Sequence, residues 1–263
     1  MFQNRWRPPR NNGEPPSAMQ WWQRSFGAHD ATEQLARLRQ QLGAAIADAE
    51  HSERPVFLRA LGQDLDGELE QLAQRAALTA NEATSEFAQR RDLLDEMVGY
   101  YCDAVVPSGR TFDAIDLSDC AREAVARLSG DMILVLRIQS EPHVVAGRRP
   151  VISLFEVAIR AASARPDDEV EVILAACSDR HAELRVSWPS TKPSADDPRQ
   201  HGRDKERFFA LAVACALKVG GTLQRQTGVS DTLVVRIPMP DASPAFALEP
   251  DVVEQATAFF AES

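Results

Sequence analysis

Apolar residues recur at steps of three and four from residue 32 to residue 106, which is the spacing of one helical face. The pattern predicts two long antiparallel helices, and Pro55 is expected to kink the first or to open a new helix. Each arm of such a hairpin has one apolar face. Two copies of the chain would therefore close a four-helix bundle around a shared core, and we expect a homodimer.

The pattern changes after Gly109, where short β-rich runs alternate with helices. Asp116 is expected to cap a helix that ends at Leu128. Apolar patterning predicts further helices over residues 150–164 and 205–219, and Gly220 is a natural C-cap for the second. Strands are predicted over residues 132–138, 144–146, 170–176, 183–188, 222–226 and 232–238. Helices on one face of a mixed sheet form an α/β sandwich, so the fold class is α+β: an N-terminal helical hairpin followed by an α/β sandwich.

The two ends differ from the body. Residues 1–30 lack apolar periodicity and hold four prolines and three of the four tryptophans, so they are predicted to be a disordered Trp/Arg tail. Such a tail packs loosely on the body or serves as a docking arm. Residues 241–263 carry five acids and no base, and an amphipathic helix there docks on its own domain or in a partner's groove. The expected units are therefore 1–30, 31–110, 111–240 and 241–263.

Composition narrows the classes of partner and compartment. The 263 residues include 39 acids and 29 bases, a net charge of −10, which argues against nucleic acid as the main partner. No apolar run is long enough to span a membrane, and the N-terminus lacks the plan of a signal peptide, so we expect a cytoplasmic protein. The four cysteines stand apart from one another, which predicts reduced thiols and no metal site.

Three stretches resemble the core of bacterial sensor histidine kinases, and together they cover roughly residues 32–240. Residues 47–55 are similar to the phosphoacceptor box, in which a His precedes an acid, a basic residue and a helix-kinking Pro. Residues 116–125 are similar to the entry into the ATP-binding domain. Residues 218–223 and 232–238 are similar to its last helix and closing strand. The resemblance implies a hairpin for dimerisation and phosphotransfer, followed by an ATP-binding domain of the GHKL type.

His51 is the candidate phosphoacceptor that the resemblance implies. A phosphoaccepting imidazole needs an exposed helix face and a nearby carboxylate that orients the ring, and Glu50 and Glu53 are close in sequence. The family places its acid directly after the His, where Ser52 stands here, and Pro55 comes one residue early. The alternative is that His51 is an ordinary surface histidine.

The resemblance also marks the positions at which the family holds ATP, and here they carry other residues. By register, the Asn that holds Mg²⁺ is Arg160, which can contact phosphate but cannot ligate a cation. The adenine-binding Asp and its glycines correspond to the stretch that begins with Trp188 and Ser190. The second glycine box, whose N–H groups hold phosphate, corresponds to the stretch with Glu206 and Phe208. We therefore predict a fold that is kept and an ATP site that is lost, with no cofactor.

The leading hypothesis is a non-catalytic histidine-kinase-like signalling protein that dimerises and docks a response-regulator receiver domain or another signalling protein. A sharper version is a histidine phosphotransferase that relays phosphate through His51. Two alternatives stay open. One is a divergent, active histidine kinase. The other is an interaction module whose former ATP cleft binds a peptide or an apolar ligand, unless Trp188, Phe208 and Phe209 simply fill that cleft.

Overall fold

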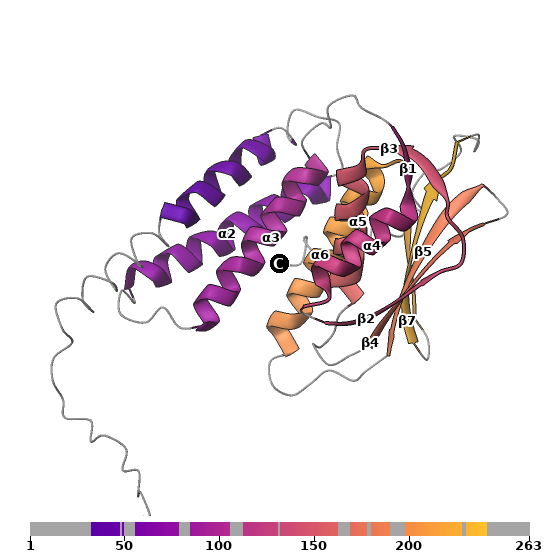
Figure 1. Ribbon diagram of the computed structural model, residues 1–263. Coiled ribbons are helices and arrows are strands. Elements are labelled where there is room, and N and C mark those ends of the chain that lie inside the picture. Colours follow the sequence, from indigo (N-terminus) through magenta and orange to yellow (C-terminus); the bar gives the residue numbers. More distant parts are fainter. Residues whose placement is uncertain are drawn as a thin grey trace, which may run out of the picture.

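The computed structural model shows a helical part and an α/β sandwich side by side (Figure 1). The fold class predicted from the sequence is confirmed. Within the described residues, no helix is long and apolar enough to cross a membrane. The residues that the structure describes are 33–47, 49, 56–78, 85–105, 113–130, 132–162, 169–177, 180–189, 198–227 and 230–240.

Three helical segments make up the N-terminal part: residues 33–47, α2 (Val56–Leu78) and α3 (Ser85–Val105). Two contacts show that the segment 33–47 runs antiparallel to α2. Arg39 pairs with Asp66, and Ile46, which comes later in the segment, lies beside Gly62, which comes earlier in α2. The α2–α3 hairpin is present as predicted. The first predicted arm, however, is divided into two antiparallel segments, and the chain reverses direction between residues 47 and 56.

The apolar faces of these three segments close on one another within a single chain. Tyr101 lies in this core and donates its O–H to the Leu58 carbonyl across 3.0 Å, which ties α3 to α2. Burying the leucine side chains is the main stabilising term, at roughly 1.5–3 kcal/mol for each. The residues of this core that are fully buried include Leu35, Leu42, Leu61, Leu65, Leu69, Leu94, Met97 and Tyr101.

Five strands form the main sheet in the order β2-β4-β5-β7-β6. Strands β2 and β4 are parallel and the other neighbours are antiparallel. A small second sheet pairs β1 with β3, and the sequence did not predict β1 because it is short and polar. The strands are β1 (Asp113–Asp116), β2 (Ile133–Ile138), β3 (His143–Ala146), β4 (Glu169–Ala176), β5 (His181–Pro189), β6 (Thr222–Gln226) and β7 (Ser230–Pro238).

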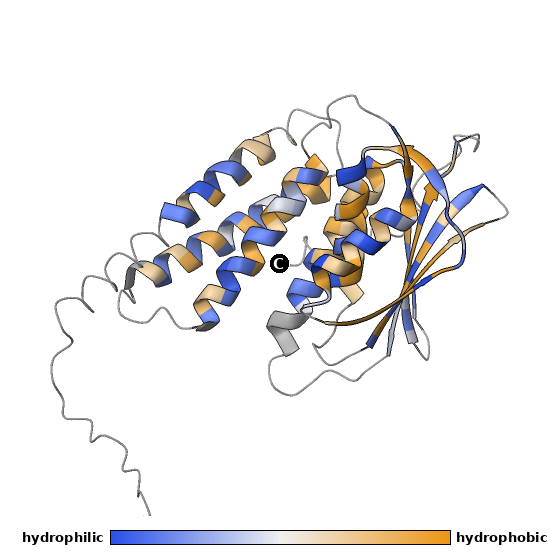
Figure 2. Cartoon of the chain, viewed as in Figure 1, coloured by the Kyte–Doolittle hydropathy of each residue, from blue (hydrophilic) through white to orange (hydrophobic). Residues whose placement is uncertain are grey.

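Helices α4 (Leu117–Leu128), α5 (Arg148–Ala162) and α6 (Pro198–Lys218) cover one face of this sheet (Figure 1). Apolar residues predominate on the central helix, α5 (Figure 2), but Ser153, Glu156 and Arg160 form a polar stripe along one side. The helix packs against strands β5 and β7, and its polar stripe meets α3, where Ser153 and Arg160 contact carboxylates. The helical part and the sandwich therefore share one hydrophobic cluster. The predicted division at residue 110 stays a prediction.

Helix α6 begins earlier than the sequence pattern predicted, at Pro198 instead of residue 205. Proline is favoured in the first turn of a helix, where its missing N–H costs nothing. The predicted end is confirmed, because Gly220 has a φ of 69° and follows the last turn. Gly221 is also required, since a Cβ there would lie 2.6 Å from the Arg236 carbonyl oxygen.

Replacing Asp116 tests the cap of α4. Its Oδ1 accepts a hydrogen bond from the Ser118 backbone N–H across 2.7 Å. Burial acts to raise the pKa of Asp116, but this hydrogen bond holds it below its ordinary value. We expect Asp116→Ala to lower the free energy of unfolding by about 1 kcal/mol at neutral pH, as measured by urea denaturation.

The depressed pKa sets the sign of the pH dependence. The contribution of Asp116 is present above its unfolded pKa and is lost as the pH falls through the folded pKa. Asp116→Asn keeps a capping oxygen that does not titrate, so it is the matched control and should retain most of the stability. Equal losses for the Ala and Asn variants would contradict a role for the cap.

Candidate functional site

Arg160, to which the resemblance assigns the position of the metal-holding Asn, contacts the helical part. Its Nε donates to Oε1 of Glu96 on α3 across 3.0 Å. Tyr100, one turn further along α3, donates its O–H to the same oxygen across 2.9 Å. The side chain that would face a triphosphate is therefore engaged by a carboxylate of its own chain, which would repel phosphate.

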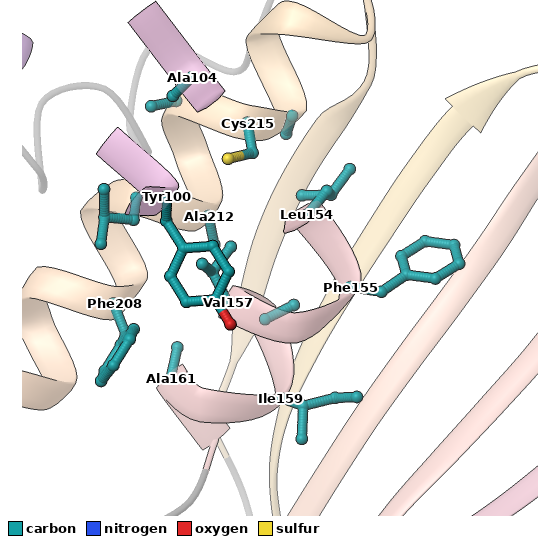
Figure 3. Close-up of a cluster of buried hydrophobic side chains, with 14 of the residues drawn as sticks. Tyr100, Ala104, Leu154, Phe155, Val157, Ile159, Ala161, Phe208, Ala212 and Cys215 are labelled. Carbon is teal, nitrogen blue, oxygen red and sulfur yellow. The ribbon is translucent and has the colours of Figure 1, made fainter. Parts of the chain in front are cut away.

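Phe208, in the stretch of the lost second glycine box, packs against Tyr100. Their ring centroids lie 6.4 Å apart at an interplanar angle of 67°, an edge-to-face arrangement. Figure 3 shows the Tyr100 ring close to Phe208 of α6 and to Val157 and Ala161 of α5. An aromatic side chain of α3 thus lies between α5 and α6, the two helices that carry Arg160 and Phe208.

The aromatic residues at this site are buried instead of lining an open cleft. Trp188, at the end of β5, is only 3% exposed, and Phe208 and Phe209 are each 4% exposed. The Lys205 ammonium lies 4.7 Å from the centroid of the Trp188 ring, a cation–π contact. This arrangement favours the interpretation that these residues fill the cleft. Ser190 lies outside the described residues.

The acids of the lost glycine box are paired with arginines. Glu206 accepts a hydrogen bond from Arg225 across 3.2 Å. Asp204 pairs with Arg90 of α3 at 2.5 Å and with Arg207 at 3.2 Å. In the fold these two acids hold neighbouring elements together.

Arg207 is a fully buried charged side chain at the contact between the sandwich and the helical part. It is fully buried on α6, and its Nε donates to Asp64 of α2 across 2.6 Å. It also pairs with Glu68, one turn further along α2. Burial acts to lower the pKa of Arg207, but the bond with Asp64 and the charge of Glu68 raise it, so the guanidinium stays charged.

Burial also shifts the pKa values of two groups near the contact between α3 and α5, Tyr100 and Glu156. Burial, together with the charge of Glu96, raises the pKa of Tyr100 above its ordinary value, so the phenol remains a donor. Burial also raises the pKa of Glu156, against the effect of Arg127, whose Nη1 lies 3.1 Å away. Both pKa shifts follow mainly from desolvation, and neither side chain lines the cavity beside Gly147 that is described below.

The candidate phosphoacceptor His51 and its two acids, Glu50 and Glu53, lie outside the described residues. Helical residues precede and follow them on antiparallel segments. His143, by contrast, is described: it is exposed on β3, and its Nδ1 lies 3.1 Å from the Glu141 carbonyl oxygen.

Metal and thiol chemistry find no support among the described residues. No cluster of His, Cys, Asp or Glu in these ranges has the makings of a metal site. All four cysteines are described, and none of them forms a disulfide. Burial raises the pKa of Cys120 to about 11 and that of Cys215 to about 12, so neither is a reactive thiolate at neutral pH.

A cavity of about 210 Å³ lies at the other end of α5 from Arg160. It is smaller than most ligand pockets, which span roughly 300–1,000 Å³. Lys218 lies at this cavity, and its ammonium donates to the Asp103 carbonyl. The cavity is lined by Val145, Ala146, Gly147, Pro150, Lys218, Val219 and Gly220.

Comparison with known proteins found similar chain courses among histidine kinases. Acinetobacter baumannii histidine kinase AdeS matches with a TM-score of 0.46 and 12% identity, over 68% of this chain and 97% of that one. A histidine kinase from Burkholderia phymatum matches with a TM-score of 0.41 and 15% identity, over 78% of this chain and 97% of that one. The mycobacterial sensor histidine kinase MprB matches with a TM-score of 0.36 and 14% identity, over 48% of this chain and 97% of that one. No protein-family model matches the sequence, and neither does a curated protein.

The described residues form a helical hairpin followed by an α/β sandwich, which is the order of elements that the resemblance to sensor histidine kinases implies. The likeness to that family is one of sequence motifs and element order. At these identities the structural likeness concerns the fold and not the activity.

Sequence reasoning did not find the residues that close the site from the helical side. Tyr100 and Glu96 belong to an ordinary amphipathic helix, and nothing in their spacing points to α5 or α6. Arg207 did carry a signal, because a basic residue directly before a long apolar run on a helix is unusual unless it is paired. The acids that pair with it, on α2, have no such signal.

The two arginines that bind Asp64 offer a matched test of this contact. Arg207 is fully buried, whereas the Arg203 side chain is 45% exposed. We expect Arg207→Met to cost about 3–5 kcal/mol of unfolding free energy, because it removes the buried cation of an ion-pair cluster. Asp64 and Glu68 would then keep only Arg203 and Arg90. Arg203→Met should cost about 0–1 kcal/mol, since exposed ion pairs contribute little. Urea denaturation measures both, and similar losses would contradict the assigned role of Arg207.

Proposed function

We propose that the chain is a non-catalytic histidine-kinase-like signalling protein, which dimerises and docks response-regulator receiver domains and does not bind ATP. It acts as a pseudokinase scaffold or as a histidine phosphotransferase. The compartment we propose is the cytoplasm, since four free thiols suit a reducing environment.

One observation carries this proposal: α3 occupies the face of the sandwich on which the family holds its nucleotide. Glu96 neutralises Arg160 and Tyr100 packs on Phe208. Trp188 is buried at the third position. A nucleotide would have to displace these contacts and would gain neither a metal-holding Asn nor a glycine-rich backbone in return. This supports a fold that is retained for docking instead of for phosphoryl transfer from ATP.

Nucleotide binding is the first test. We expect calorimetry with millimolar Mg·ATP and Mg·ADP to show no binding heat, and thermal melting to show no shift. Glu96→Ala serves as a variant that frees Arg160, and it should not restore binding, because the Asn and the glycines are still missing. Binding tighter than about 100 μM, roughly 5.5 kcal/mol, would contradict the proposal and favour the divergent active kinase.

The relay through His51 is tested separately with phosphorylated receivers. Receiver domains encoded in the same genome are phosphorylated with acetyl phosphate and mixed with the chain. If His51 is the phosphoacceptor, His51→Ala should abolish the acid-labile label on the chain. His143→Ala, which replaces an exposed histidine on β3, is the control and should leave the label unchanged.

The two versions of the function separate in this experiment. Label that persists in His51→Ala would exclude the relay in this form. The scaffold would then be judged by co-sedimentation of the chain with receivers. Failure of every receiver to bind would contradict the scaffold as well.

A further inference from the structure

The cavity between the start of α5 and the end of α6 opens at a partly apolar patch of the sandwich. Val145, on β3, lines this cavity and is 54% exposed. Pro150 lines it from the first turn of α5, and Val219 lines it just after the end of α6. A cavity of roughly 150 Å³ accommodates a benzene ring. The volume of about 210 Å³ found here therefore has room for one phenylalanine side chain.

Strand β7 brings the C-terminal segment of the chain to this cavity. Its Arg236 carbonyl oxygen lies 2.6 Å from the place where a Cβ of Gly221 would stand, and Gly220, the residue before, lines the cavity. The described residues end at Pro240, which lies within about 14 Å of Arg236 because four residues extend no further. Phe246 follows six residues later, and these span at most about 20 Å. Phe246 can therefore reach the cavity of its own chain.

The segment after Pro240 has a composition that suits this surface. Residues 244–248 read Pro-Ala-Phe-Ala-Leu, an apolar stretch with an acid on either side, at Asp241 and Glu249. Residues 241–263 as a whole hold five acids and no base. They lie outside the described residues, so the argument for their position comes from the surface that the described residues present.

Two arginines directly before Pro150 give the rim of the cavity positive charge. Arg149 is 80% exposed and pairs with Asp103 across 3.0 Å. Arg148 is 49% exposed and pairs with Glu123 across 2.8 Å. A guanidinium has five N–H donors, so each of these two exposed groups can bind a further carboxylate. An acidic segment without bases complements this rim.

We propose that residues 241–263 pack back on the sandwich of their own chain, with Phe246 in the cavity and the acids that follow it near Arg148 and Arg149. The short connection favours the chain's own segment over a partner's, because a tether of six residues gives Phe246 a high effective concentration at the cavity. The packed segment removes Val145 and the apolar stretch from water. A partner that uses this surface has first to displace the segment.

A photoreactive phenylalanine analogue at residue 246 tests this packing in the full chain. Irradiation should crosslink it, within one chain, to residues 145–150 or 218–220, as located by peptide mass spectrometry. Val145→Glu places a carboxylate at the cavity, which disfavours both the ring and the acidic segment. The crosslinking yield should then fall about tenfold, since burial of a phenylalanine side chain contributes at least that factor to a docking equilibrium.

Ile133→Glu is the matched control, because it also replaces an exposed apolar residue on a strand. Ile133 is 52% exposed and begins β2, which runs in the same direction as β7, so it lies at the end of the sheet away from the cavity. This substitution should leave the crosslinking yield unchanged. Circular dichroism checks that both variants keep the fold.

Three results would overturn the inference. The first is a crosslink that falls elsewhere on the sandwich or on the helical part, or on no residue outside 241–263. The second is a product of twice the chain mass, which would show that the segment packs on another copy. The third is an equal yield from Val145→Glu and Ile133→Glu. The inference does not rest on the proposed function, whose nucleotide and receiver assays stand whichever result is found.

Discussion

The fully buried guanidinium of Arg207 has to stay paired with its carboxylates for the helical part and the sandwich to remain packed on one another. Removing one partner of a buried ion pair typically costs several kcal/mol, because a charge is then left without compensation. Asp64 and Glu68 are therefore held against α6, and α2 with them. Since α3 is packed on α2, its position over the sandwich follows from the same constraint.

The position of α3 in turn decides what the sandwich can bind. Glu96 and Tyr100 reach α5 and α6 only because the helical part is fixed at this distance from them. The positions that the resemblance assigns to the nucleotide and the contacts made by α3 lie on the same surface. An empty cavity there would cost stability, and side chains of α3 together with the buried aromatics occupy this space.

Local periodicity was sufficient to predict most of the sandwich. Strands β4 and β5 alternate apolar and polar residues, and the cap of α4 directly precedes its apolar face in the sequence. Periodicity carries no direction, however. Pro55 indicated a break in the first arm, but the spacing of Leu35 and Leu42 is the same whether their helix continues toward α2 or folds back on it, so the reversal was not predictable. Contacts between Tyr100 and Phe208 join residues far apart in sequence, and each alone fits an ordinary apolar stripe.

The contact between α5 and α3 has a consequence for how such a protein is inherited. In a modular signalling protein, recombination joins a helical unit from one gene to a sandwich from another, and each brings a water-compatible surface. Here Ser153 and Arg160 of α5 bind carboxylates of α3, and Tyr100 of α3 packs beside apolar residues of α5. A sandwich separated from its own α3 would lose these specific partners and expose the apolar residues between them. The helical part and the sandwich are therefore expected to be inherited as one unit and to evolve together.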